Sequence, residues 1–275
     1  MIVVPTRFHH VREYADRNVI ETTSNFYEEY YAPHFPRLLK LFDAYAPLSE
    51  DWIALSSFDL TVAKHLLGYS GSYFLDTGYG KPRAVKKYLT GNQVSQGLIS
   101  YVQERQQAGE VVPREFIFAA NHSELQNICV ELGIERSDLL QMADSAVKTI
   151  AEMMQIQTAL FLHHSNFSTF MDGRITGEFW LMPSMQLEKT VRRTNAGDTA
   201  AGAFLAAYTV TRDPKVACFL ANAAAGLRVS EDQLPTRDNL LQFFANCRTK
   251  NVVLPGARTI LPEELKRQVV SQKPK

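Results

Sequence analysis

The sequence has few cysteines, no net charge and no long apolar run. Its three cysteines are far apart, which is typical of buried thiols in a reducing compartment rather than of disulfides or a Cys-x-x-Cys metal site. The balance of 29 basic and 29 acidic residues argues against binding of nucleic acid as the main task. No segment approaches the roughly 18 apolar residues of a membrane span, and residues 1–5 are too short for the apolar part of a secretion signal. We therefore expect a cytoplasmic protein that binds neither nucleic acid nor membrane.

Apolar and aromatic residues are plentiful by contrast. The 275 residues are 45% hydrophobic and 21% charged, and they include 16 Phe and 11 Tyr. A chain of this length and composition can bury a core without disulfide or metal staples. We expect a single globular domain over 1–275.

Short apolar runs alternate with helical patterns through the middle of the chain. Such alternation indicates βαβ units, a mainly parallel sheet and helices on both of its faces, and therefore an α/β fold. The predicted strands are 52–56, 72–75, 115–119 and 157–162, and the predicted helices are 60–67, 83–105, 123–132 and 137–154.

The pattern changes after residue 165. The Asp172-Gly173 pair between two apolar runs predicts a hairpin with strands at 168–171 and 179–182. The remaining segments predict helices, at 199–210, 214–227 and 236–244, with a last one opening at Pro262. Residues 1–50 are hard to interpret beyond an edge strand at 7–14.

A small, glycine-containing turn leads directly into the helix at 199–210. The turn reads Asn195-Ala196-Gly197-Asp198. Backbone N–H groups at such a helix start point toward an anion, and Gly197 allows a phosphate to approach closely. Asp198 can simply cap the helix, or it can accept a proton from a hydroxyl while the N–H groups hold a phosphoryl group.

A second polar segment follows the strand at 115–119, where ligands of open α/β folds bind. It reads Asn121-His122-Ser123-Glu124. Asn121 and Glu124 are three residues apart and can face one site from a first helical turn, where a carboxylate and an amide suit a hydrated Mg²⁺. The alternative is helix capping by Asn121 or Ser123, with Glu124 in the acidic first turn.

Both segments resemble one family in order and context. The segment 194–204, TNAGDTAAGAF, resembles the second signature of the ribokinase-like (PfkB) carbohydrate kinases. The alanine-rich run 221–227, ANAAAGL, resembles the helix that lies beside the nucleotide base there, and Asn121-x-x-Glu124 resembles the family's metal and phosphate motif. The resemblance runs from about 52 to 244. It implies a three-layer α/β/α sandwich and transfer of the γ-phosphoryl of ATP to a hydroxyl of a sugar or similar small molecule, with Mg²⁺.

The resemblance also implies roles for particular residues. Asp198 would be the catalytic base, and Glu124 would act on Mg²⁺ through water. The other implied positions are an anion hole from the amides of Asn195, Ala196 and Gly197, contacts with Mg²⁺ or phosphates from Asn121, His164 and Ser165, and a nucleotide contact from Asn222.

The sequence departs from the family pattern in two places. Asn195 replaces the first glycine of the phosphoryl-transfer motif, and Arg192 stands where an aspartate is common. The family binds its sugar through a Gly-Gly motif near the front, but this chain has no Gly-Gly pair and only about fifty residues before its core at 51–270. We therefore expect residues 1–50 to be a divergent segment with a reduced or absent lid. Homodimer formation through that lid is then not expected, but a homodimer formed in another way stays possible.

These departures leave two alternatives open. One is a catalytically inactive kinase-fold protein that binds a nucleotide or another ligand. The other is an ADP-dependent sugar kinase, because 11–14 and Met182-Pro183 have a faint similarity to the ADP-dependent glucokinase branch.

Overall fold

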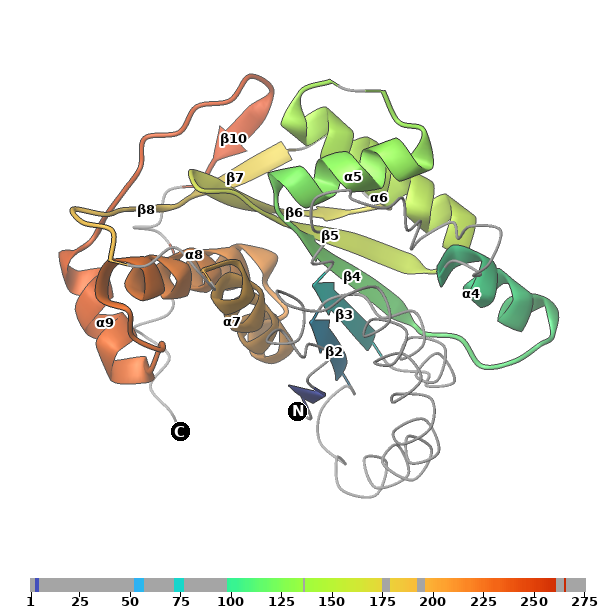
Figure 1. The fold of residues 1–275 in the computed structure, drawn as a ribbon, viewed down its shortest axis with the longest axis horizontal. Coiled ribbons are helices and arrows are strands. Elements are labelled where there is room, and N and C mark those ends of the chain that lie inside the picture. Colours follow the sequence, from blue (N-terminus) through green and yellow to red (C-terminus); the bar gives the residue numbers. More distant parts are fainter. Residues whose placement is uncertain are drawn as a thin grey trace, which may run out of the picture.

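The fold is that of a computed structural model of the chain, shown in Figure 1. The structure describes the residues 3–4, 52–56, 72–76, 98–135, 137–174, 179–191, 196–260 and 265. Three predictions lie outside these residues, namely the edge strand at 7–14, the helix at 60–67 and the helix opening at Pro262, and so does the part 83–97 of the helix predicted at 83–105.

A single mixed sheet of eight strands runs through the described part of the chain, in the order β1-β2-β3-β4-β5-β6-β7-β10. Neighbouring strands are parallel except at β6, which is antiparallel to both β5 and β7. The bounds are β1 (Val3–Val4), β2 (Trp52–Ser56), β3 (Ser72–Asp76), β4 (Glu115–Ala120), β5 (Gln157–His163), β6 (Phe167–Asp172), β7 (Phe179–Pro183) and β10 (Ala257–Thr259). The mainly parallel sheet and the two antiparallel strands expected at 168–171 and 179–182 are confirmed. Asp172 is the last residue of β6 rather than a turn residue, and positions 175–178 of the connection lie outside the described residues.

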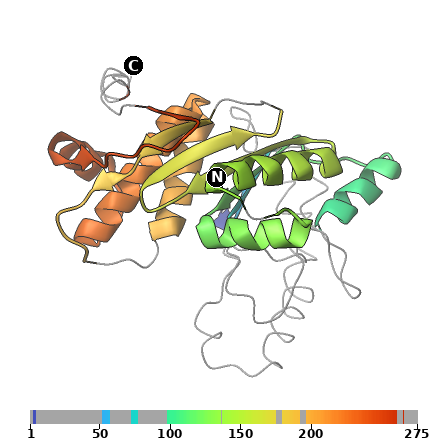
Figure 2. The same ribbon diagram turned by 90° about the horizontal axis from the view of Figure 1, so that it is seen from above.

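Alternating side chains of the central strands face two different helix layers. In β4, Phe116 and Phe118 pack into the core under α4 (Leu98–Gln107), α5 (His122–Leu132) and α6 (Leu139–Met154). Ile117 and Ala119 face the opposite core, under α7 (Ala196–Thr211), α8 (Pro214–Glu231) and α9 (Arg237–Asn246). Figures 1 and 2 show the two groups of helices apart, one in green and one in orange. The expected three-layer α/β/α sandwich is therefore present.

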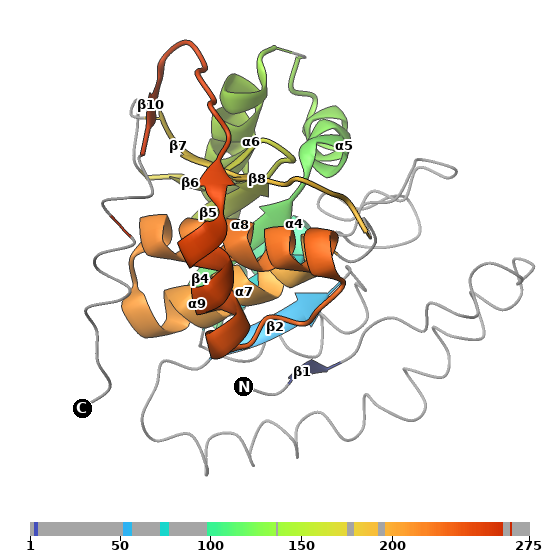
Figure 3. The ribbon, with the colours of Figure 1, turned by 90° about the vertical axis from the view of Figure 1, so that its left-hand side faces the viewer.

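Small residues bring α8 close to its neighbours. A Cβ atom on Gly226 would lie 3.1 Å from Cζ of Phe243 and 3.2 Å from Cβ of Met185, so a larger side chain would push these groups apart. Figure 3 shows α7 and α8 side by side. Helix α7 is also packed against the sheet, because Phe204 of α7 stacks on Phe161 of β5 with ring centroids 4.1 Å apart. This contact fixes the position of the N-terminal turn of α7.

Several boundaries differ from the prediction. Helix α7 begins at Ala196 rather than 199, and α8 continues to Glu231 rather than to 227. No glycine ends α8: Asp232 caps it in the left-handed conformation, with φ 55°. The short ribbon of β8 (Met185–Gln186) and β9 (Arg248–Thr249) was not expected. No helix among the described residues has the length and apolar character needed to cross a membrane.

Candidate functional site

Asn121 and Glu124 lie at the junction between β4 and α5, at the carboxyl edge of the sheet. Asn121 is the N-cap of α5, and its Oδ1 accepts the backbone N–H of Glu124 at 3.1 Å. Glu124 Oε2 in turn accepts the backbone N–H of Asn121 at 2.8 Å. The two side chains therefore form a reciprocal capping box, so the capping interpretation is confirmed. Their contact with metal or phosphate stays a prediction.

The neighbouring strand ends at His163, and a second histidine follows it. Because Ala120 of β4 pairs with Leu162 of β5, Asn121 and His163 follow at the same edge of the sheet. The ring centroid of the next residue, His164, lies 6.1 Å from that of His122 at the start of α5. The ends of β4 and β5 thus bring the segment 121–124 close to His163 and His164.

A lysine side chain lies against the turn that follows β5. Lys250 donates from Nζ to the backbone oxygen of Ser165 at 2.7 Å and to Oδ1 of Asn166 at 3.1 Å. Burial lowers the pKa of His164, and the charges of His122 and Lys250 lower it further. The lowered pKa favours the neutral form of His164, so Lys250 supplies the positive charge at this turn. The phosphate contacts expected of His164 and Ser165 stay predictions.

The first turn of α7 faces the end of β5. Ala196 and Gly197 open the helix, and the N–H groups of a first turn have no carbonyl partner within their helix. A Cβ atom on Gly197 would lie 3.1 Å from Cε1 of His163, so this turn lies directly against the imidazole ring. Asn195, the third expected member of the anion hole, lies outside the described residues.

Asp198 is exposed and lies inside the first turn of α7, as its third residue. A carboxylate there is stabilised by the positive end of the helix dipole. The alternative in which Asp198 is the N-cap is wrong, because the helix begins two residues earlier. The carboxylate is therefore accessible to a ligand. Its role as a base stays a prediction.

His163 is a site residue to which sequence reasoning assigned no role. Its Nε2 is buried and has no hydrogen-bond partner among the described residues. Burial lowers the pKa of His163 to about 4, although the charge of Asp198 raises it and His164 lowers it. The ring is therefore neutral near pH 7. The only signal in the sequence was a polar residue at the end of an apolar strand.

Asn222 lies in the middle of α8 and is buried. Its amide nitrogen donates to the backbone oxygens of Met182 at 2.8 Å and Pro183 at 3.1 Å. These bonds attach α8 to the end of β7 across 39 or more residues of sequence. The observed role is structural, and a nucleotide contact stays a prediction.

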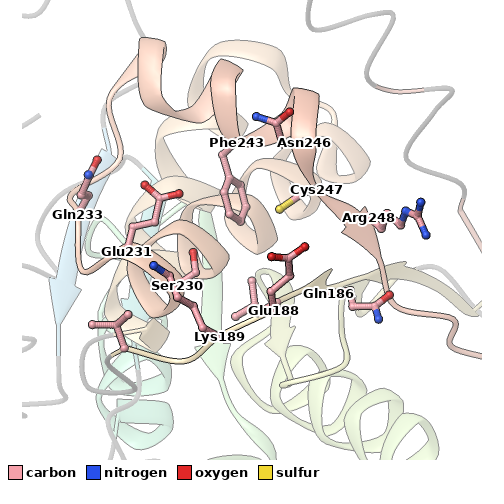
Figure 4. Close-up of a pocket in the computed structure, with 12 residues that line it drawn as sticks. Gln186, Glu188, Lys189, Ser230, Glu231, Gln233, Phe243, Asn246, Cys247 and Arg248 are labelled. Carbon is pink, nitrogen blue, oxygen red and sulfur yellow. The ribbon is translucent and has the colours of Figure 1, made fainter.

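A cavity of about 850 Å³ opens beside the C-terminal half of α8 (Figure 4). The segment leading from β8 toward α7 forms one wall, and its Val191 donates a backbone hydrogen bond to Val229 of α8 at 2.8 Å. Phe243 is a buried aromatic residue of the lining. Most of the other lining side chains are polar, among them Gln186, Glu188, Lys189, Glu231, Gln233, Asn246 and Arg248.

Within the described part of the chain, no group of three or more His, Cys, Asp or Glu side chains could hold a metal ion. Mg²⁺ does not need such a group, because it keeps several waters and usually takes one or two carboxylates together with substrate phosphates. Glu124, already engaged with a backbone N–H, suits a water-mediated contact.

Comparison with known proteins gives a family and a fold. The model of the pfkB family carbohydrate kinases matches residues 91–236, more than half of the chain. Among solved structures, adenosine kinase from Schistosoma mansoni in complex with 2-fluoroadenosine has a TM-score of 0.52 and 16% identity, covering 76% of this chain and 58% of that one. Ribokinase from Thermotoga maritima has a TM-score of 0.48 and 16% identity, with 71% and 57% covered.

The chain spans less than two thirds of the length of these two kinases. No curated protein matches it. At 16% identity, the likeness to the adenosine kinase shows the fold alone.

Proposed function

The chain belongs to the pfkB family of carbohydrate kinases, and we propose that it transfers the γ-phosphoryl group of ATP to a hydroxyl of a carbohydrate or similar small molecule. One observation carries this proposal. The exposed Asp198, in the first turn of α7, lies beside the end of β5, and the Asn121–Glu124 capping box follows the adjacent strand. A base, a helix N-terminus and a second carboxylate thus share one edge of the sheet, which suits phosphoryl transfer.

Asp198 acts as the general base. Its carboxylate accepts the proton of the acceptor hydroxyl as that oxygen bonds to the γ-phosphorus, and the bond from this phosphorus to the bridging oxygen of ADP breaks. The exposure of Asp198 supports this role, because an acceptor can reach it without rearrangement of the core.

The first amides of α7 stabilise the charge on the transferred group. The N–H groups of Ala196 and Gly197 open the helix and carry the positive end of its dipole, and that of Asn195 would complete the anion hole. They need no reorganisation during the reaction, and fixed donors of this kind lower the barrier most in a site that excludes water.

Glu124 and Asn121 would hold the hydrated Mg²⁺ that accompanies the nucleotide, while His164 and Ser165 would contact its phosphates. When bound, Mg²⁺ neutralises charge on the phosphate oxygens. The capping box keeps Glu124 in one orientation before any ligand arrives. The ammonium group of Lys250, which bonds the backbone oxygen of Ser165 at 2.7 Å, supports binding of a polyphosphate there.

The nucleoside part of the donor would occupy the cavity beside α8. Its volume of about 850 Å³ is within the range of small-molecule sites, and it combines an aromatic residue with polar side chains that could bond a base and a ribose. Val191, in its wall, lies five residues before the first residue of α7, so a nucleotide could reach from the cavity toward the amides of that helix.

A second candidate is a kinase-fold protein that binds a nucleotide or another ligand without turnover. The absence of a Gly-Gly pair, the family's sugar-binding motif, from the sequence favours it. ADP in place of ATP as donor stays a third candidate, which the same experiment tests.

Thermal shift and turnover with defined ligands separate these candidates. Mg·ATP and Mg·ADP are tested with D-ribose, D-fructose, D-glucose and adenosine as acceptors, since ligands of the native state raise its melting temperature. Stabilisation with ATP turnover supports the proposal, and stabilisation without turnover supports the binding protein. Phosphoryl transfer from ADP alone would make ADP the donor.

Asp198→Asn tests the base. We expect kcat to fall by about a thousandfold with little change in nucleotide binding, as for loss of a general base. Asp238→Asn is the matched control, because Asp238 is also an exposed acidic residue in the first turn of a helix. Full activity of Asp198→Asn would contradict the mechanism.

A further inference from the structure

His163 has the least expected environment in the candidate site. It ends β5, and the contact of its ring with the helix start is close: Cε1 lies 3.1 Å, and Nδ1 and Nε2 each 3.9 Å, from where a Cβ of Gly197 would be. On its own strand, the ring centroid of Phe161 lies 5.7 Å away. The imidazole therefore fills the space between the end of the strand and the first turn of α7.

An imidazole in this space lowers the stability of the folded state. Nε2 is buried without a partner among the described residues, and a buried unsatisfied polar group costs about 1–3 kcal/mol. A leucine or methionine would fill a similar volume without that cost. Unsatisfied groups of this kind are rare in native proteins and often have a functional reason.

Asp198 is the acidic group that acts on this ring. Among the described residues, two ionisable groups influence the pKa of His163: Asp198 on α7, which raises it, and His164, which directly follows β5 and lowers it. Burial exceeds both effects, so the ring stays neutral and keeps one N–H and one lone pair at neutral pH. A neutral imidazole can donate a hydrogen bond to a carboxylate without transferring its proton, so the carboxylate keeps the negative charge that a base needs.

We propose that His163 is a positioning residue for Asp198: its neutral imidazole supports the Gly197–Asp198 turn, and its buried Nε2–H donates a hydrogen bond to the Asp198 carboxylate when the acceptor is bound. The inference rests on the proposed function, because it assigns a partner to the proposed base. His163 keeps its proton throughout, while the proton of the acceptor hydroxyl goes to Asp198.

The tautomer of His163 can be measured without any turnover. In the full chain labelled with 15N-histidine, the imidazole resonances of His163 are identified by their loss in His163→Gln. We expect a neutral ring with the proton on Nε2 that does not titrate between about pH 6 and 8. A proton on Nδ1 would overturn the inference, because Nε2 could not then donate.

Kinetics of two variants test the donor itself. His163→Leu keeps bulk but removes both nitrogens, and we expect kcat to fall about tenfold or more, the effect of losing one hydrogen bond to a charged group. His163→Gln places an amide N–H near the position of Nε2, and we expect kcat within about threefold of the wild type. KM for Mg·ATP should change by less than about twofold in both, because the bond concerns the acceptor side.

Stability measurements separate positioning from packing. The melting temperature of His163→Leu should equal or exceed that of the wild type, since the unsatisfied nitrogen is gone. Thr169→Val is the matched control: the buried Thr169 hydroxyl donates to the oxygen of Trp180 at 2.6 Å within the sheet, so its loss should lower stability and leave kcat unchanged. Wild-type kcat in His163→Leu, or a kcat of His163→Gln as low as that of His163→Leu, would overturn the inference alone. A wild type that phosphorylates no acceptor of the panel would instead overturn the proposed function.

Discussion

The carboxylate of Glu124 accepts the backbone N–H of Asn121 at 2.8 Å, while the Asn121 side chain accepts the backbone N–H of Glu124 at 3.1 Å. This reciprocal pair joins two explanations that were alternatives in the sequence. The bonds stabilise the start of α5, and they also hold a carboxylate in a fixed orientation at the carboxyl edge of the sheet. Capping and a metal role can therefore coexist, and substitutions can separate them.

Glu124→Gln should lose the metal role and keep the cap. Glutamine at this position also accepts the N-cap N–H, so the free energy of unfolding should change by less than about 0.5 kcal/mol. The lost charge should raise the Mg²⁺ concentration needed for half-maximal turnover about tenfold. Glu124→Ala should lose both properties and cost about 1 kcal/mol of stability. Urea unfolding and Mg²⁺ titration of activity measure the two effects, and an unchanged Mg²⁺ dependence in Glu124→Gln would exclude Glu124 from the metal site.

Gly197→Ala should impair turnover more than stability. The added Cβ would lie 3.1 Å from Cε1 of His163, so the ring or the helix start must move by a few tenths of an ångström. Small displacements of catalytic groups are costly, and we expect kcat to fall about tenfold or more. The measurement is steady-state kinetics with Mg·ATP.

Gly202→Ala provides the control in the same helix. Beyond the backbone of its own helix, no atom of the described residues lies within 4 Å of its added Cβ, and alanine is favoured over glycine inside a helix by roughly 0.5–1 kcal/mol. This variant should therefore be more stable and equally active. Equal kcat in both alanine variants would show that the contact with His163 has no part in catalysis.

The layers of the fold were predictable because local patterns specify them. The fully buried strand β4 reads as a continuous apolar run, as parallel strands covered on both faces do. Gly133, with φ 69°, marks the end of α5, and Asp213 before Pro214 marks the start of α8. In each case the residues that form the boundary are adjacent in sequence.

The features that were missed depend on contacts between distant segments. No side chain of β10 is fully buried and that of Arg258 is exposed, so β10 is a strand because it pairs with β7 from more than seventy residues away. The cavity beside α8 has walls from several separate segments. Likewise, His163 Nε2 is buried where α7 approaches the end of β5 closely, and nothing in the local sequence of a His-His pair indicates that approach.

Asn222→Ala should destabilise the protein through α8 and β7. The substitution removes two donors to the carbonyls of Met182 and Pro183 and leaves a small cavity in a buried position. We expect a loss of about 2–3 kcal/mol in the free energy of unfolding by urea. Asn127→Ala, on a partly exposed part of α5, should cost less than about 1 kcal/mol. A small effect in Asn222→Ala, with weaker nucleotide binding, would instead assign Asn222 to the nucleotide.

Glu115 should make stability depend on pH at the opposite edge of the sheet. It is buried and accepts hydrogen bonds from Ser72 at 3.0 Å and Gln157 at 3.1 Å. Burial raises the pKa of its carboxyl, although the Ser72 bond and the charge of Arg114 oppose the rise. The folded state therefore holds this proton more tightly than the unfolded chain. Its stabilising contribution is complete below the unfolded pKa of about 4.3 and is lost as pH rises through the folded value.

Comparison with Glu115→Gln, which cannot titrate, isolates this contribution. The free energy of unfolding of the wild type minus that of the variant should fall as pH rises from about 5 to 8. Urea unfolding at each pH measures it, with Glu152→Gln, at an exposed position of α6, as the control that should show no such slope. A difference that grows with pH would mean that the hydrogen bonds and nearby arginines outweigh burial. Glu115 would then be stabilised as a carboxylate.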